Sequence, residues 1–197
     1  MKILIGALIA IGVLTNSASA QTVQKLPDPV KTGGLPLMEA IAARKSSKSF
    51  TNKEIDNQTL SEILWVAYGI NRDEDKRTIP TAQNKKDLEV YVIKADGAWR
   101  YDAVNNSLIQ VNNKNLLSDH QTQDYMKDVP VVLVFSGSTG KDWAALHAGS
   151  AYQNVGLYTA SKGMKNVVRG YFDKKTTNKS LSIPKGQSAV ITQAIGW

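Results

Sequence analysis

Two turn signals in the middle of the chain constrain its fold most strongly, because they force neighbouring strands to run antiparallel. Asp96-Gly97 and Asn105-Asn106 are typical of hairpin turns, and they separate three segments that are rich in branched and aromatic residues. These segments are residues 88–94, 99–101 and 108–111. We therefore expect three consecutive antiparallel strands.

Other strand candidates occur singly between helices. Strands are predicted at 131–135, 166–170 and 187–195, and helices at 37–44, 59–69 and 141–163. The last helix is the longest, and its many alanines would let another helix or a flat ligand come close. Either Asp56 or Thr59 can cap the second helix, and residues 71–87 are predicted to be a polar loop. This mixture favours an α+β fold with a largely antiparallel sheet.

The first twenty residues have the pattern of a secretory signal peptide. Lys2 precedes an apolar run over residues 3–14, and the segment ends in Ala18-Ser19-Ala20. The run is shorter than the about twenty apolar residues that a membrane-spanning helix needs. We expect cleavage near Ala20, export to the periplasm or the medium, and no membrane insertion.

The remainder of the chain is predicted to form one domain. Residues 21–34 contain two prolines and a glycine pair, which indicates an extended arm or linker before a domain at 35–197. The absence of cysteine excludes disulfides, thiolate metal sites and a cysteine nucleophile. The two histidines lack the spacing of a metal site.

The positive charge of the chain suits an anionic ligand. The formal net charge is +7, but the lysines are scattered and are not interleaved with aromatic residues. A stacking platform for nucleic acid is therefore not expected. Binding to an anionic envelope surface is an alternative use of this charge.

Three segments contain residues suited to an anionic, planar ligand. Residues 44–49 place three cations and three hydroxyls after the first short helix, as a phosphate site requires. Residues 77–84 form a loop that can present backbone N–H groups and an amide to a heterocycle. Residues 167–171 place a glycine at a strand end, where the backbone can approach a ligand. Each segment alone also fits an ordinary turn, loop or bulge.

Taken in order, these segments resemble the nitroreductase family of flavin enzymes. The resemblance is greatest to its small branch, which is related to the dehydrogenases that oxidise thiazoline and oxazoline rings. It extends from about residue 37 to residue 197, and its motifs are Arg44-x-Ser46-x-Lys48-x-Phe50 and residues 64–71, 77–84, 89–92, 148–149, 153–157, 169–171, 183–186 and 195–197.

The resemblance implies an intertwined homodimer that binds FMN, with a central antiparallel sheet flanked by helices and NAD(P)H as the usual donor. Its cofactor-binding positions are Arg44, Lys45, Ser46 and Lys48 for the phosphate and ribityl chain, Pro80, Thr81, Ala82 and Asn84 in a loop that covers the ring from the partner subunit, and Arg169 and Gly170 in the turn whose backbone faces the flavin N5.

Some positions depart from the family pattern. Lys86 stands where the family has glutamine, Arg169 replaces an acidic or polar residue, and the stretch 111–129 is short. No side chain is assigned as a catalytic acid or base. The sequence therefore predicts an exported FMN-dependent oxidoreductase that acts on a small organic molecule. The alternative is an exported protein of the same fold that binds flavin or another anion without turnover.

Overall fold

The three strands predicted around the turn signals form the middle of a larger sheet. Within the residues that the computed structural model describes, 21–140 and 142–197, this sheet has seven strands in the order β1-β6-β5-β4-β7-β9-β8, and all its neighbouring strands are antiparallel. Its strands are β1 (Val23–Lys25), β4 (Glu89–Lys94), β5 (Gly97–Asp102), β6 (Ser107–Asn112), β7 (Val131–Ser138), β8 (Lys165–Arg169) and β9 (Gln187–Gly196). The predicted α+β fold with an antiparallel sheet is confirmed.

The two faces of the sheet contribute to two separate cores. Val90 and Val92 of β4 lie in one core, and Tyr91 and Ile93 lie in the other. This follows from the alternation of side chains along a strand. All four residues are at most 1% exposed, so both faces must be covered by other elements.

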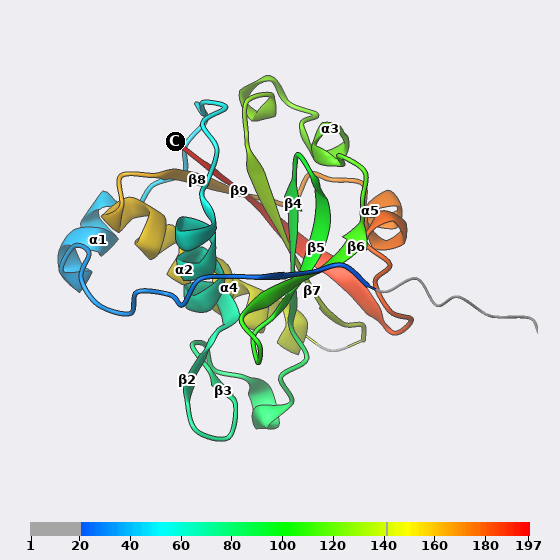
Figure 1. Cartoon of the computed structure of the whole chain (residues 1–197), viewed down its shortest axis with the longest axis horizontal. Coiled ribbons are helices and arrows are strands. Elements are labelled where there is room, and N and C mark those ends of the chain that lie inside the picture. Colours follow the sequence, from blue (N-terminus) through cyan, green and yellow to red (C-terminus); the bar gives the residue numbers. More distant parts are fainter. Residues whose placement is uncertain (1–20, 141) are drawn as a thin grey trace, which may run out of the picture.

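Two long helices cover the first face. α2 (Asn57–Tyr68) packs on α4 (Trp143–Ser161), and α4 contacts β7, β8 and β9 (Figure 1). The buried side of α4 includes Ala148, Ala151 and Val155, whose small side chains allow close packing. A shorter helix, α1 (Leu37–Ala43), packs on α4 from outside.

Asp56 is the residue that caps α2. Its carboxylate accepts a hydrogen bond from the Thr59 backbone N–H at 2.8 Å, which satisfies one of the free donors of the first turn. Of the two caps that the sequence allows, the structure therefore selects Asp56.

Short elements that the sequence pattern does not predict cover the second face. They are α3 (Leu117–His120), the 3-10 turn η2 (Asp124–Met126) and α5 (Lys174–Ser180). In α5 only Thr177 is buried, so its sequence has no apolar stripe. Hydrophobic periodicity cannot reveal a helix of this kind.

The predicted polar loop at 71–87 contains regular structure. β2 (Ile70–Arg72) and β3 (Lys76–Arg77) form a hairpin, followed by the 3-10 turn η1 (Ala82–Asn84). Glu74 and Asp75 in the hairpin turn have φ angles of 57° and 54°. Aspartate tolerates this left-handed region but glutamate does not. The turn residues 73–75 include neither glycine nor asparagine, the strongest turn signals, which explains why the hairpin was missed.

The arm at 21–34 is integrated into the sheet. β1 pairs with β6, Leu26 is 2% exposed, and the carbonyl of Pro27 accepts hydrogen bonds from Ser61 and Asn106. The arm then continues past α2 to α1, as the blue ribbon in Figure 1 shows. The predicted leader, residues 1–20, lies outside the described residues. No helix in the described ranges has the length and apolarity needed to span a membrane.

Candidate functional site

The basic turn, residues 44–49, lies between α1 and the edge strand β8. The side-chain stem of Arg44 approaches Gly156 of α4, where an added Cβ would be 3.4 Å from Arg44 Cδ. The Ser47 backbone N–H donates to the Asn166 carbonyl at 2.8 Å. These contacts fix the turn against α4 and β8, and leave Lys45, Ser46 and Lys48 exposed.

The cations of the basic turn have no carboxylate partners among residues 21–140 and 142–197. The ion pairs found there involve Lys76, Lys94, Arg100, His147 and Lys162. The Nζ atom of Lys48 lies instead 5.9 Å from the centre of the Tyr125 ring. A turn that combines uncompensated cations with exposed serine hydroxyls fits the phosphate end of FMN.

The cation at the other end of β8 is used differently. Arg169 is 4% exposed. Its guanidinium donates to the carbonyls of His120 (2.8 Å) and Tyr171 (3.0 Å), to Gln123 Oε1 (3.1 Å) and to Thr122 Oγ1 (3.3 Å). These hydrogen bonds therefore link the end of β8 to residues 120–123 and to Tyr171, and the guanidinium does not face a ligand.

Gly170, the next residue, is exposed, and an added Cβ would meet no atom within 4 Å. At this turn it is the backbone of Gly170 that is open to a ligand. This agrees with a role for the turn through its main chain, which stays a prediction.

A segment that the sequence analysis missed connects the two ends of this region. Tyr125 lies beside Lys48, and its hydroxyl donates to Gln123 Oε1 at 2.8 Å, the atom that also accepts from Arg169. Residues 120–126 thus form a wall that contacts both Lys48 of the basic turn and Arg169 at the end of β8. No motif in residues 120–126 predicts this role, because the role depends on their contacts with the buried Arg169.

His120, at the start of this wall, is 2% exposed, and its Nδ1 atom has no hydrogen-bond partner among the described residues. Burial lowers the pKa of His120, Asp119 opposes this effect, and the charge of Arg169 adds to it. His120 is therefore held in its neutral form beside the buried guanidinium.

The loop with Pro80, Thr81, Ala82 and Asn84 lies near the other end of α4. The Ala82 backbone N–H donates to His147 Nε2 at 2.7 Å, and His147 Nδ1 lies 2.9 Å from Asp87 Oδ1. Pro80 and Asn84 are exposed, and Thr81 and Ala82 are half-buried. Lys86, one of the departures from the family pattern, donates to the Glu74 carbonyl at 2.8 Å and ties the loop to the β2–β3 hairpin.

The structure does not bring the loop and the basic turn together within one chain. The loop is anchored at His147 and the turn at Gly156, nine residues further along α4. This separation is roughly 13 Å along the helix axis. The arrangement is compatible with the expectation that the loop acts on the cofactor of a partner subunit.

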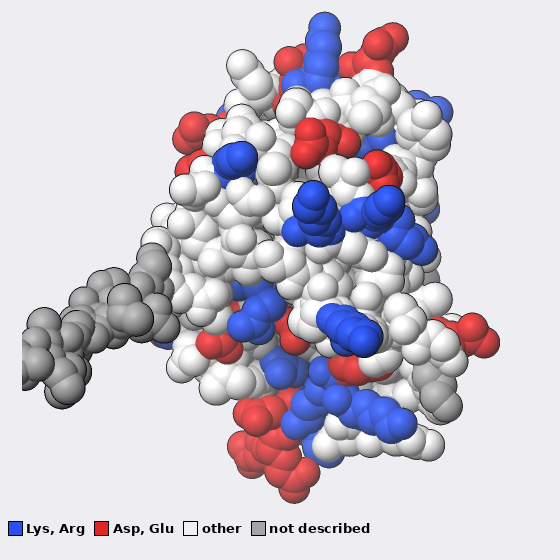
Figure 2. Space-filling view, turned by 90° about the vertical axis from the view of Figure 1, so that its right-hand side faces the viewer, with Lys and Arg blue, Asp and Glu red and all other residues white. Residues whose placement is uncertain are grey.

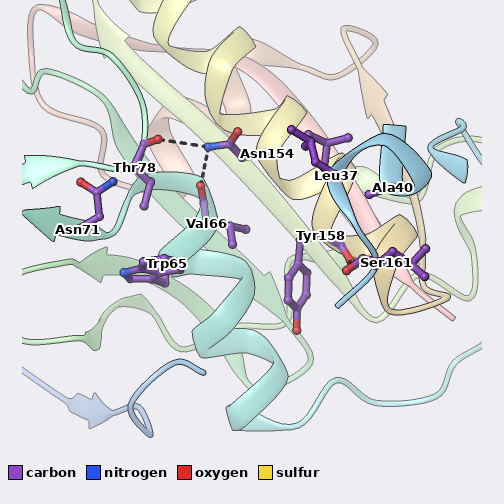
Figure 3. A pocket seen from close by; sticks show the side chains of 11 residues that line it. Leu37, Ala40, Trp65, Val66, Asn71, Thr78, Asn154, Tyr158 and Ser161 are labelled. Carbon is purple, nitrogen blue, oxygen red and sulfur yellow. Dashed lines mark hydrogen bonds between the residues drawn. The ribbon is translucent and has the colours of Figure 1, made fainter. Parts of the chain in front are cut away.

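An open groove lies between α1, the end of α2 and the outer face of α4. Its volume is about 420 Å³, and Figure 3 shows Leu37, Trp65 and Tyr158 among the side chains that line it. The Asn154 amide spans the groove floor and donates to the carbonyls of Val66 (3.0 Å) and Thr78 (3.5 Å). Apart from these polar contacts, the lining is mainly apolar.

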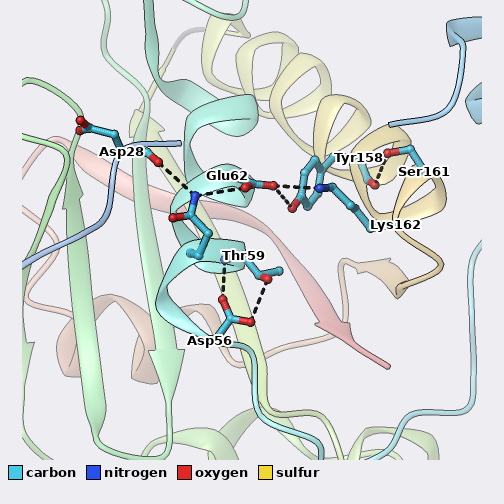
Figure 4. A network of polar contacts seen from close by, with 8 residues as sticks. Asp28, Asp56, Thr59, Glu62, Tyr158, Ser161 and Lys162 are labelled. Atoms are coloured by element: carbon cyan, nitrogen blue, oxygen red, sulfur yellow. Dashed lines mark hydrogen bonds and ion pairs between the residues drawn. The ribbon is translucent and has the colours of Figure 1, made fainter. Parts of the chain in front are cut away.

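A buried carboxylate lies next to this groove. Glu62 is 5% exposed and accepts hydrogen bonds from Tyr158 (2.6 Å) and Gln58 (3.1 Å), and Lys162 pairs with it at 3.2 Å (Figure 4). Burial alone would raise the pKa of Glu62, but the hydrogen bonds from Tyr158 and Gln58 and the contact with Lys162 lower it below its usual value. Burial and the bond to Glu62 raise the pKa of Tyr158. This network joins α2 to α4 with every partner satisfied.

The described part of the chain contains no cluster of three metal-ligating side chains of the His, Cys, Asp or Glu type. On the face shown in Figure 2, several lysine and arginine side chains gather in the lower half, beside carboxylates.

Comparisons with known proteins identify the fold and the family of the chain. A nitroreductase-named protein of Methanocaldococcus jannaschii is 23% identical over 171 residues, which cover 76% of this chain and 85% of that protein. The crystal structure of a nitroreductase-named protein from Ralstonia eutropha has a TM-score of 0.83 and 30% identity, and the match covers 98% of this chain and 95% of that one.

A third similar structure comes from the Escherichia coli microcin synthetase complex McbBCD. It has a TM-score of 0.69 at 16% identity and covers 100% of this chain and 78% of that chain. At this identity the likeness shows a shared fold. The sequence model of the Nitroreductase family matches residues 41–197, which include the basic turn, the loop and the Gly170 turn. Together with the antiparallel sheet that carries these segments, this match shows that the chain belongs to the nitroreductase family.

Proposed function

We propose that the protein is an exported FMN-dependent oxidoreductase that transfers hydride or electrons between a donor and a small organic acceptor. The observation that carries the proposal is the basic turn: Arg44, Lys45 and Lys48 lie together with no carboxylate partner in the described chain. Clustered cations repel one another, so a turn of this kind is stabilised by an anion. Membership of the nitroreductase family makes FMN the anion of choice.

The chain's own residues would bind and orient the cofactor. Arg44 offers a planar fork of donors to the phosphate, Lys45 and Lys48 offer point charges, and Ser46 offers a short neutral donor. A lysine that reaches toward the ring would also stabilise negative charge on the reduced flavin. FMN, when bound, supplies the redox chemistry itself.

The apolar surface around α1 and α4 supports a homodimer. Leu37, Met38, Ile41 and Leu146 are 64%, 74%, 46% and 66% exposed. Exposed apolar side chains of this size on α1, next to a mainly apolar groove, are typical of a surface that another protein covers. A second copy on this surface would also bring its loop at 80–84 toward the basic turn of the first.

Export is supported by the sequence of residues 1–20 alone. Export would limit the choice of electron donor, because NAD(P)H is scarce outside the cytoplasm. We therefore infer that NAD(P)H reduces the protein in the test tube, whereas in the cell the electrons come from a redox protein, a quinol or a substrate that the enzyme itself oxidises.

The decisive test is the absorbance spectrum of the purified mature protein, followed by reduction and reoxidation. Flavin bands that bleach on reduction and return with a nitroaromatic acceptor would support the proposal. A protein that binds FMN but passes no electrons to an acceptor would instead be a binding protein of the same fold. A colourless protein that does not bind added FMN would refute the flavin assignment.

A further inference from the structure

His147 connects the two ends of the loop at 80–87. Its Nε2 atom accepts the Ala82 backbone N–H at 2.7 Å, and its Nδ1 atom contacts the Asp87 carboxylate at 2.9 Å. The imidazole is 4% exposed. It thus bridges Ala82, which begins the 3-10 turn, and Asp87, which lies two residues before the start of strand β4.

These two contacts fix the protonation state of the ring. A backbone N–H can only donate, so Nε2 must carry a lone pair and the proton must lie on Nδ1, where it is donated to Asp87. Only the neutral imidazole with this tautomer makes both bonds. If Nε2 also carried a proton, the Nε2–H group and the Ala82 N–H group would be two donors facing each other.

The loop needs such a restraint because its backbone is unusual. Between the two anchor points, Gln83, Asn84 and Lys86 have φ angles of 53°, 55° and 51°. This left-handed region is disfavoured for residues with a side chain, and only asparagine among the three tolerates it well. A free loop with this sequence would populate other conformations, so the contacts at its two ends select the one observed.

The conformation of this loop matters to the proposed function, because the loop contains the residues predicted to cover the flavin: Pro80, Thr81, Ala82 and Asn84. On the basis of the proposed function, we propose that His147 is a positioning residue for the cofactor. The neutral imidazole holds the loop in its left-handed conformation and so presents the loop to FMN. The essential group is the hydrogen-bond acceptor on Nε2. Asp87 orients the ring by fixing the proton on Nδ1.

Two substitutions separate the acceptor from the bulk of the side chain. His147→Leu fills similar space but leaves the Ala82 N–H without a partner, whereas His147→Gln places an amide oxygen close to the position of Nε2. With the full mature chain, hydrogen exchange of the Ala82 amide is measured without flavin, and FMN affinity is measured by fluorescence quenching.

We expect His147→Leu to accelerate exchange in residues 80–87 and to weaken FMN binding by about tenfold, the effect of one buried hydrogen bond. His147→Gln should retain the slow exchange and stay within about threefold of the wild-type affinity. If glutamine behaves like leucine, or if leucine leaves FMN affinity unchanged, the inference is wrong.

A further variant covers the case in which His147→Leu folds poorly. Gln83→Gly removes the left-handed penalty at one position, so adding it to His147→Leu should recover folding and part of the FMN affinity. Failure of this rescue would show that the loop conformation is not what His147 controls.

The same measurements separate this inference from the proposed function. A wild-type protein that binds no FMN would overturn the proposed function and the cofactor role of His147 together. Hydrogen exchange in the two His147 variants would still decide whether the imidazole orders the loop.

Discussion

Arg169 and the basic turn lie along the same edge of the sheet, yet they use positive charge in opposite ways. Arg169 is buried, and its guanidinium donates to four acceptors that hold residues 120–123 and the Tyr171 carbonyl. Arg44, Lys45 and Lys48 contact β8 and α4 only through the stem of Arg44 and the backbone of the turn, and their charges have no carboxylate partners in the described chain. A cation that donates several hydrogen bonds to the protein itself serves the fold, whereas one whose donors have no protein partner is available to a ligand.

The largest effect is expected where charge serves the fold. Arg169→Met should lower the free energy of unfolding by about 3 kcal/mol, because several buried acceptors lose a charged donor. Urea unfolding followed by circular dichroism measures this change. Arg169→Lys keeps the charge but lacks the planar guanidinium, so it should lower the free energy of unfolding by less than Arg169→Met does. A loss below about 0.5 kcal/mol for Arg169→Met would remove the basis of the comparison.

The reverse pattern is expected for the basic turn. Arg44→Gln combined with Lys48→Gln should weaken FMN binding by about a hundredfold, or about 2.7 kcal/mol, and change the unfolding free energy by less than about 0.5 kcal/mol. Flavin fluorescence titration and urea unfolding give the two values. The control is Lys174→Gln with Lys175→Gln on α5, which changes the net charge equally outside the basic turn. Full flavin content in the first variant would contradict the phosphate assignment.

A smaller effect on the free energy of unfolding is expected for Glu62, which is a buried charge with hydrogen-bond partners on both α2 and α4. Glu62→Gln should cost about 1 kcal/mol at pH 7, because the hydrogen bonds from Tyr158 and Gln58 lose their charged partner.

The effect of pH on this variant has a definite sign. The pKa of Glu62 is lowered in the folded protein, so its stabilisation is complete above the unfolded-state pKa of about 4.3. It is lost as the pH falls through the lower folded value. The difference in unfolding free energy between the wild type and Glu62→Gln should therefore shrink below about pH 4. The exposed Glu54→Gln serves as the control, and a difference that is constant with pH would contradict this account.

The smallest effect on stability is expected at the open end of the Arg169 turn. Gly170→Ala adds a methyl group where no atom lies within 4 Å, so the unfolding free energy should change by less than about 0.5 kcal/mol. If the backbone of Gly170 faces the flavin, FMN affinity should still fall by about threefold, or about 0.7 kcal/mol. Unchanged affinity would show that the ligand does not approach this turn.

The sequence predicted the parts of the fold that local patterns encode. Hairpin turns and strand alternation gave β4, β5 and β6, and the apolar run gave β7. The β2–β3 hairpin was missed because its turn uses Glu74 and Asp75 in a left-handed conformation. Helix α5 was missed because its lysines and threonines bury almost nothing.

The candidate site was predictable in its residue types but not in its connections. A cluster of cations and hydroxyls is visible in the sequence around Arg44. That Arg169 turns inward, or that His147 bridges Ala82 and Asp87, depends on residues from 46 to 65 positions apart in the chain. Such contacts arise from tertiary packing, which no local pattern records.

The pairing of β1 with β6 limits how the protein can be shortened. The family match begins at residue 41, and a chain trimmed to that boundary would look complete by sequence. It would nevertheless lose a sheet strand, the buried Leu26 and the start of α1. The uncovered backbone of β6 would then be a template for association with other molecules. The trimmed protein should therefore aggregate, whereas a chain that begins at Gln21 should stay dispersed.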